Sequence, residues 1–241
     1  MLEINKIHLG DSYTLIKEIP DKSVDLVIID PPYGIDQANG TNGFGQSNNK
    51  RYDGNWDTTS PSKEFFDEIL RVGKTVLIFG AQYLTDKLPQ SNCWIVWDKI
   101  GEMSTQSPFS ECELIWTNKI NTVVTKKYFI RQHGFINDGD ERVHATQKPL
   151  RLLHDLIQDF STEGELIMDF FSGSGTTCVA AKELNRRFIG IEINANYHRI
   201  SVERLNGITT SGQTSIFTDF EQLSIAPQES AEGKENENDM D

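Results

Sequence analysis

The sequence predicts an α/β fold with a mainly parallel sheet. Apolar runs of strand length alternate with helical patterns, the run at 24–29 is apolar on both faces, and residues 165–191 follow the order strand, glycine turn, helix, strand. Alternating strands and helices are typical of parallel sheets, in which each helix returns the chain to the same edge. A strand that is apolar on both faces is expected at the centre of such a sheet.

The individual elements follow from the period of the apolar residues. Residues 36–60 show no period and are rich in Gly and Asn, so we expect a long loop there, and such loops are usually functional or disordered. In chain order, the expected elements are a strand at 4–9, a helix around 15–19, a strand at 24–29, a helix around 65–70, strands at 75–79, 93–97 and 113–116, a helix at 150–160, a strand at 165–170, a helix at 176–184 and a strand at 188–191.

The composition agrees with one domain that has a sizeable core. The chain has 241 residues, of which 37% are hydrophobic and 10% aromatic. It contains no apolar run of about eighteen residues, and residues 1–5 lack the order of a signal peptide, so we expect a cytoplasmic protein without a membrane span. Cys93, Cys112 and Cys178 lack the paired spacing of a zinc site, and we expect no bound metal.

The net charge of −13 is unevenly distributed along the chain. Residues 219–241 hold eight acidic residues and one lysine, and we expect the segment 208–241 to be a disordered acidic tail. Residues 117–151 hold seven basic residues against three acidic ones. This local excess of positive charge suits a phosphate backbone, although a solvated surface of mixed sign is the alternative.

A glycine turn between a strand and a helix predicts a nucleotide-cofactor loop. The segment Asp169-Phe170-Phe171-Ser172-Gly173-Ser174-Gly175-Thr176-Thr177 joins the strand at 165–170 to the next helix. Glycine allows close approach of a ligand, and the helix N-terminus supplies free N–H groups. Glu192 ends the following strand, where a carboxylate accepts hydrogen bonds from ribose hydroxyls. A glycine turn needed only for packing is the alternative, and a P-loop lacks its lysine.

The segment Asp30-Pro31-Pro32-Tyr33 indicates which kind of protein that binds a nucleotide cofactor this chain is. It ends the buried strand at 24–29. Prolines donate no backbone hydrogen bond, so carbonyls near them point outward as unpaired acceptors. An exocyclic amine on a base is a poor nucleophile because its lone pair is delocalised into the ring. Acceptors aimed at its N–H groups, such as the Asp30 carboxylate and the Pro31 carbonyl, would counter that delocalisation. Tyr33 suits stacking on a base extruded from a duplex. An ordinary Pro-Pro turn with a surface tyrosine is the alternative for these residues in isolation.

With these motifs in this order, the chain resembles the amino-methylating DNA methyltransferases of the permuted β class. The resemblance covers roughly residues 4–205. It implies the Rossmann-like fold of methyltransferases that depend on S-adenosylmethionine (AdoMet), with a seven-stranded, mostly parallel sheet that has one antiparallel strand. It also implies that the strand bearing Asp30 lies beside the strand bearing Asp169, so that methyl donor and target amine face each other at the switch point of the sheet.

The resemblance also assigns residues to roles. The family's catalytic tetrapeptide corresponds to Asp30, Pro31, Pro32 and Tyr33. The segment His144-Ala145-Thr146-Gln147-Lys148-Pro149 is similar to the one that precedes the family's cofactor-binding helix, with Ala145 in place of the commoner proline, and Phe170 also replaces a proline. The expected cofactor-binding residues are Asp11, Lys148, Asp169, Phe171, Gly173, Gly175, Thr176, Thr177 and Glu192.

DNA is the expected partner, and recognition is expected to involve residues 118–143. This segment is too short for a domain, so recognition is short, shared with the loop at 36–60, or completed by a second copy in a homodimer. The recognition sequence itself, and whether a restriction enzyme accompanies the chain, are not evident from the sequence. The basic residues expected to contact phosphates are Lys50, Arg51, Lys126, Lys127 and Arg131.

Within this family, aspartate at position 30 favours transfer of the methyl group to the N6 amino group of adenine in DNA, and several alternatives differ from this prediction. Cytosine carbon-5 methylation needs a cysteine after a proline, and no Pro-Cys pair exists. Cytosine N4 methylation uses similar chemistry but usually has Ser where Asp30 stands, and methylases of protein glutamine or RNA more often begin the motif with Asn. Gly173, Gly175 and Glu192 also fit part of the fingerprint of an NAD-type oxidoreductase. A non-catalytic DNA-binding protein would be expected to lose one motif.

Overall fold

The computed structural model describes residues 2–35, 58–99, 110–119, 126–129 and 147–207. The chain divides into two units, residues 1–208 and 209–241, and the fold below is that of the first. Its strands are β1 (Lys6–Leu9), β2 (Val24–Ile29), β3 (Gly73–Ile78), β4 (Trp94–Asp98), β5 (Cys112–Thr117), β6 (Lys126–Phe129), β7 (Leu166–Asp169) and β8 (Arg187–Glu192). Its helices are α1 (Ser12–Leu15), α2 (Lys63–Val72), α3 (Leu150–Phe160), α4 (Thr176–Glu183) and α5 (Ala195–Leu205), with short 3-10 turns η1 (Ile16–Glu18) and η3 (Ala81–Tyr83).

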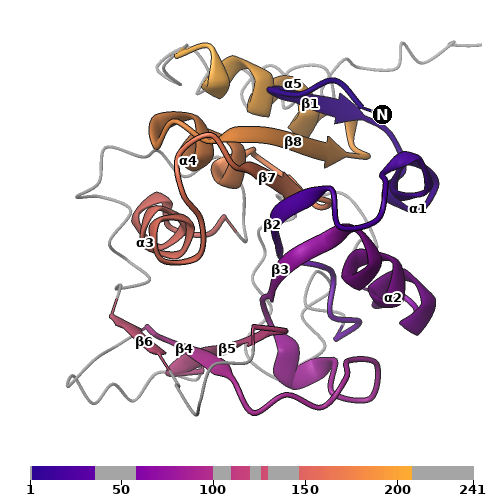
Figure 1. The fold of residues 1–241 in the computed structure, drawn as a ribbon, viewed down its shortest axis with the longest axis vertical. Helices are drawn as coiled ribbons and strands as arrows, with labels where there is room; N and C mark the ends of the chain where they lie inside the picture. Colours follow the sequence, from indigo (N-terminus) through magenta and orange to yellow (C-terminus); the bar gives the residue numbers. More distant parts are fainter. Residues whose placement is uncertain (1, 36–57, 100–109, 120–125, 130–146, 208–241) are drawn as a thin grey trace, which may run out of the picture. The chain divides into compact units, whose positions relative to one another are not determined.

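The strands form one twisted sheet in the order β1-β8-β7-β2-β3-β5-β4-β6 (Figure 1). Strand β5 runs antiparallel to both of its neighbours, β3 and β4, and the other described pairs are parallel. This confirms the mostly parallel α/β fold with one antiparallel strand. The described residues contribute eight strands where the resemblance implied seven, because β6 adds an edge strand beside β4. Backbone pairing with β4 forms this strand within residues 118–143, the segment that the sequence predicts for DNA recognition.

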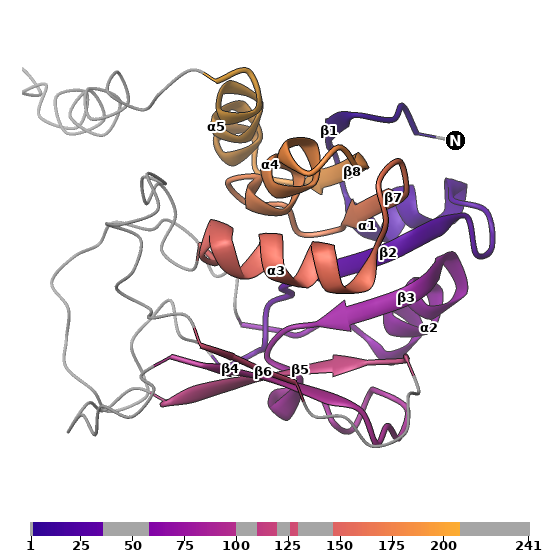
Figure 2. The ribbon, with the colours of Figure 1, turned by 60° about the vertical axis from the view of Figure 1, so that its left-hand side comes forward.

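Helices cover the sheet on both sides (Figure 2). One core layer joins the sheet to η1 and α2, and includes Ile16, Phe66 and Ile69. The other joins it to α3 and α4, and includes Leu153 and Ala180. Strand β2 contributes to both layers, since Val27 and Ile29 face the first and Leu26 and Ile28 face the second. Its apolar run therefore reflects burial on two faces, as expected of a central parallel strand.

Local signals explain where the helices begin. Asp11 accepts a hydrogen bond from the Tyr13 N–H at the start of α1, and Ser62 accepts one from the Phe65 N–H at the start of α2. Asn194 caps α5, a helix that the sequence pattern did not predict. Its buried residues are few, Ile200 and Ser201, so it has no continuous apolar face to reveal it. No described helix is long and apolar enough to cross a membrane.

Gly175 is required by packing between α4 and α5. Its φ is 81°, which L side chains rarely adopt, and a Cβ there would lie 2.7 Å from the Cβ of Ser201. Gly164 has a similar φ of 79°, but a Cβ there would meet nothing within 4 Å. The two glycines therefore share the conformational requirement and differ in the steric one.

We predict that Gly175→Ala destabilises the protein more than Gly164→Ala. Both substitutions force alanine into the left-handed region, at about 1–2 kcal/mol. Gly175→Ala adds overpacking against α5, at roughly 1–3 kcal/mol more. Urea denaturation of the two variants measures the difference. Equal losses of the free energy of unfolding would contradict the close approach of α4 and α5.

Candidate active site

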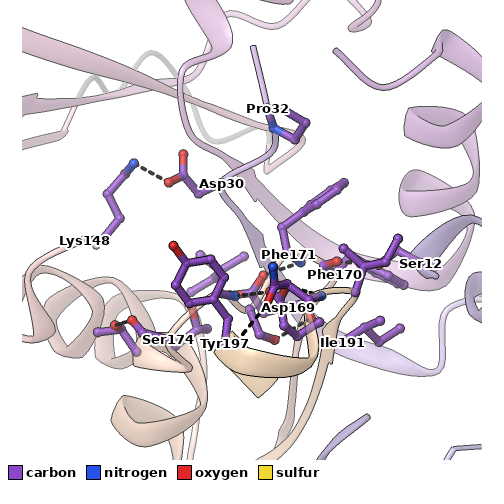
Figure 3. Close-up of a pocket in the computed structure, with 18 of the residues that line it drawn as sticks. Ser12, Asp30, Pro32, Lys148, Asp169, Phe170, Phe171, Ser174, Ile191 and Tyr197 are labelled. Carbon is purple, nitrogen blue, oxygen red and sulfur yellow. Dashed lines mark hydrogen bonds and ion pairs between the residues drawn. The ribbon is translucent and has the colours of Figure 1, made fainter. Parts of the chain in front are cut away.

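A cavity of about 420 Å³ lies at the carboxyl ends of the parallel strands. Its lining includes residues directly after β1, β2, β3, β7 and β8, together with Gln147 and Lys148 before α3 (Figure 3). This edge is where open α/β sheets bind ligands, because the loops leaving the strands diverge there. The volume lies within the range of about 300–1,000 Å³ that is typical of small-molecule and cofactor sites.

The glycine loop forms the wall of this cavity between β7 and α4. The Gly175 N–H donates to the Ser172 carbonyl at 2.7 Å, which closes the turn. Gly173 lines the cavity with a φ of 51°, and a Cβ at that position would point into open space. The loop therefore turns its backbone toward the cavity without a side chain at this point. A ligand can approach the backbone closely here.

Glu192 is fixed at the cavity by the backbone. It ends β8, and its two carboxylate oxygens accept hydrogen bonds from the Gly173 and Asn194 N–H groups, each at 2.7 Å. Burial raises the pKa of the carboxyl group, although these N–H groups oppose the shift. A carboxylate has about four acceptor sites, so the N–H groups of Gly173, Asn194 and Ile193 still leave room for a ligand hydroxyl.

Asp169 places a second carboxyl group in the cavity. Burial raises its pKa to about 7, and the charges of Asp30 and Glu192 act in the same direction. Hydrogen bonds from Thr177 and from the Phe171 N–H lower the pKa and oppose this shift. Near neutral pH this group is therefore close to half ionised. A cationic ligand in the cavity would favour its ionised form.

Two residues outside the predicted set, Arg204 and Gln147, hold the glycine loop in place. The Arg204 guanidinium on α5 donates to the Ser174 carbonyl at 2.6 Å and to the hydroxyl of Thr176 at 3.1 Å. The Ser174 hydroxyl in turn donates to the Gln147 side chain at 3.2 Å. Gln147 stands next to a predicted residue, whereas Arg204 gave no signal because α5 itself was not predicted. These contacts connect α5 and the segment before α3 to one loop.

Asp30 follows β2 and faces Lys148. The Lys148 ammonium lies 2.5 Å from the Asp30 carboxyl group, and Figure 3 shows the lysine extending toward it. Burial raises the pKa of Asp30, helped by the charge of Glu113 and opposed by that of Lys148. Lys148 and Pro32 line the cavity with Asp30, while Pro31 is buried beside them.

Tyr33 turns away from this lining toward η3 and β5. Its ring stacks on Tyr83 with centroids 5.5 Å apart, and its hydroxyl hydrogen-bonds to Asp30 and, at 3.0 Å, to Glu113. Gly80 makes room for the ring, because a Cβ there would lie 2.0 Å from a Tyr33 carbon. The hydroxyl thus links the predicted catalytic carboxylate to one that the sequence did not indicate.

Glu113 completes a buried cluster of charges. Its carboxylate lies 3.0 Å from the Lys99 ammonium and 3.5 Å from that of Lys148. Burial alone raises the pKa of Glu113, but these two ammonium groups outweigh it and leave the pKa below its usual value. For Lys148, burial lowers the pKa, but Asp30 and Glu113 outweigh it and raise the pKa. The cluster therefore sets two carboxyl groups, Asp30 and Glu113, against two amino groups, Lys99 and Lys148.

The structure brings most of the predicted site residues together. Asp11, Lys148, Asp169, Phe171, Gly173, Thr176, Thr177 and Glu192 line the cavity with Asp30 and Pro32. Gly175 supports α4 from outside the lining. The structure does not place the side chains of the predicted DNA contacts. Lys50, Arg51 and Arg131 lie outside the described residues, and Lys126 and Lys127 are described in their β6 backbone alone. Among the described residues, no group of three acidic, Cys or His side chains forms a metal site.

Comparison with known proteins gives consistent matches. The model of a family described as DNA methylase matches residues 82–203. Type II methyltransferase M.HpaI from Haemophilus parainfluenzae is 30% identical, over 79% of this chain and 71% of its own. Type II methyltransferase M1.MboII from Moraxella bovis is 28% identical, over 82% of this chain and 95% of its own. The crystal structure of the M1.HpyAVI–SAM complex has a TM-score of 0.56 at 22% identity, covering 83% of this chain and 98% of that one.

We predict that Asp169→Asn changes the dependence of stability on pH. The pKa of Asp169 is raised in the folded protein, so the folded state binds more protons than the unfolded state between about pH 4 and 7, and stability falls as the pH rises through that window. The asparagine variant lacks this loss. From pH 5 to 8, the wild type should lose roughly 2–3 kcal/mol relative to the variant, as measured by urea denaturation. Parallel curves for both proteins would contradict the raised pKa.

Proposed function

Since the chain belongs to the DNA methylase family, we propose that it transfers a methyl group from AdoMet to the exocyclic N6 amino group of adenine. Its activity as a DNA methyltransferase follows from the family. The choice of adenine is supported by the carboxylate of Asp30 in the catalytic tetrapeptide, where enzymes that act on cytosine N4 usually have Ser.

One observation carries the mechanism: the carboxyl ends of β2 and β7 meet at the cavity. These strands pair in parallel, with Val27 opposite Met168. The register places Asp169 level with Ile28, so Asp30 lies two residues further along the neighbouring strand, at the same edge of the sheet. The two strands are about 4.8 Å apart. A target amine at Asp30 and a methyl donor at Asp169 would face each other.

The cavity fits AdoMet in its chemistry as well as in its volume. The cofactor carries cationic groups, which the carboxyl groups of Asp169 and Glu192 suit, and ribose hydroxyls, for which Glu192 keeps acceptor sites. At the cavity lining, Tyr13 and Ile193 are apolar side chains that are 43% and 72% exposed. Such surfaces suit an adenine ring. When bound, AdoMet supplies the electrophilic methyl group.

Asp30 acts on the target amine in this proposal. Its carboxylate accepts a hydrogen bond from the amine and favours the positive charge that develops on nitrogen during transfer. The Pro31 carbonyl is the second proposed acceptor. Glu192 and the glycine loop hold the donor in place, and the pairing of β2 with β7 sets the approach of the two reactants. Positioning of this kind accounts for a large part of the rate in such displacements.

The remaining assignments are proposals that rest on the sequence. We propose that residues 1–207 form the catalytic domain in the cytoplasm, that residues 118–143 and 36–60 contact DNA, and that Lys50, Arg51, Lys126, Lys127 and Arg131 bind phosphates. A homodimer would complete recognition if these segments are too short to do so alone. Lys148 is proposed to act at the cofactor cavity, where its ammonium also contacts Asp30.

We expect N6-methyladenine as the product. The measurement is nucleoside mass spectrometry of DNA incubated with the protein and AdoMet. Methylation-sensitive sequencing of DNA from an expressing host then identifies the recognition site. If N4-methylcytosine alone is found, the family assignment stands and the adenine assignment is wrong.

We also expect Asp30→Ala and Glu192→Ala to separate transfer from cofactor binding. Loss of Asp30 removes one partner of the transition state, at about 3–4 kcal/mol, or a hundred- to a thousand-fold in rate. AdoMet affinity should change little. Glu192→Ala should instead weaken AdoMet binding and leave single-turnover transfer at saturating cofactor much less affected.

Calorimetric titration with AdoMet and single-turnover assays measure the two effects. A near wild-type rate for Asp30→Ala at saturation would show that Asp30 is not the acceptor of the amine.

A further inference from the structure

Glu113 is a buried carboxylate that touches the catalytic tetrapeptide from outside the cavity. Its side chain is 8% exposed, and it is not among the cavity-lining residues. It hydrogen-bonds to Tyr33 and pairs with Lys99 and Lys148. Burying a charged group costs free energy of desolvation even when the group is paired, so this arrangement has a cost that an apolar residue would avoid.

The direction of β5 explains how Glu113 reaches the site. The strand runs antiparallel to β3, with Ile78 opposite Trp116, so its first residues lie at the edge where the parallel strands end. Glu113 stands near the start of β5, and Lys99 directly follows β4, which pairs with β5. A parallel strand in this position would place its first residues at the opposite edge. The one antiparallel strand therefore delivers a carboxylate to the amine site.

Lys148 is divided between two carboxylates. Its ammonium is 2.5 Å from Asp30 and 3.5 Å from Glu113. Lys148 and Tyr33 contact different oxygens of Asp30, the ammonium Oδ2 and the hydroxyl Oδ1. Glu113 contacts both of these side chains. A carboxylate oxygen has two acceptor sites, so the direction in which the remaining sites of Asp30 point depends on how Lys148 and Tyr33 are held.

We infer that Glu113 is a positioning residue for methyl transfer, one that fixes Lys148 and Tyr33, the two side chains that contact the oxygens of Asp30, and so sets the orientation of the Asp30 carboxyl group toward the target amine. Glu113 acts through these two side chains and does not touch the substrate. This role rests on the proposed action of Asp30. It predicts a variant that binds AdoMet normally and transfers slowly.

The test compares Glu113→Gln with Glu111→Gln. Both remove one negative charge near the start of β5, but Glu111 is exposed. Single-turnover rates at saturating AdoMet should fall about ten- to a hundred-fold for Glu113→Gln, as for a small misplacement of a reacting group, and stay within about twofold for the control. AdoMet affinity, by calorimetry, should be unchanged in both. Glu113→Asp should recover part of the rate.

The pH dependence of the rate distinguishes positioning from general stability. Lys148, Glu113, Tyr33 and Asp169 are the charged or titratable groups that act on Asp30. The charge of Glu113 raises the pKa of Asp30. The acid limb of the rate profile should therefore move to lower pH in Glu113→Gln.

The outcomes separate this inference from the proposed function. If the wild type does not methylate DNA, the function itself fails. If the wild type is active and Glu113→Gln matches Glu111→Gln in rate and in acid limb, the positioning role is wrong. A loss of AdoMet affinity in Glu113→Gln equally overturns it. Should Glu113→Gln not fold, Glu113→Asp carries the test, and a single-turnover rate for Glu113→Asp equal to that of Glu111→Gln overturns the role.

Discussion

The parallel pairing of β2 with β7 is the constraint on which the site depends. It places Asp30 and Asp169, 139 positions apart in the chain, on neighbouring strands at one edge of the sheet. The strands are held by backbone hydrogen bonds and covered by apolar layers on both faces, so their ends cannot shift independently. The amine site and the cofactor cavity are therefore parts of one rigid element. Catalysis by positioning needs such rigidity, because a small misplacement of reacting groups is costly.

Around this element, buried charges are arranged in balance. Asp30 and Glu113 face Lys148 and Lys99, whereas Asp169 is close to half ionised near neutral pH because burial raises its pKa to about 7. The first group sets two carboxyl groups against two amino groups. Asp169 is suited to gain a negative charge when a cation enters the cavity. Asp30 and Asp169 thus differ in the partners that surround them, and carboxyl groups with shifted pKa values are common at catalytic sites.

The loop side of the cavity is fixed by a different set of contacts. Gly173 and Gly175 have different roles in the loop. A Cβ at Gly173 would meet open space, whereas one at Gly175 would clash with Ser201. Glu192 and Arg204 then hold the middle of the loop through hydrogen bonds to the backbone of Gly173 and Ser174. The cavity shape therefore depends on α5, which contributes little to the core but fixes the loop.

The sequence by itself determined the alternation of strands and helices, the glycine loop, the tetrapeptide after β2 and the acidic end of β8. These are local signals: apolar periods, turn residues and short motifs. The single antiparallel strand and the neighbouring positions of Asp30 and Asp169 came from resemblance to a family, and strand pairing confirmed both.

Only the tertiary structure decided which charges meet. Tyr33 reaches Glu113 across 80 positions and Lys148 reaches Asp30 across 118. In the sequence, Glu113 is one polar residue in an alternating strand, a pattern that equally describes a solvent-facing side chain. Similarly, β6 and α5 carry too weak an apolar period to be predicted, and they form because neighbouring elements supply the pairing edge and the packing surface. Periodicity reports which face of an element is buried, whereas the identity of the groups that cover it depends on contacts between distant segments.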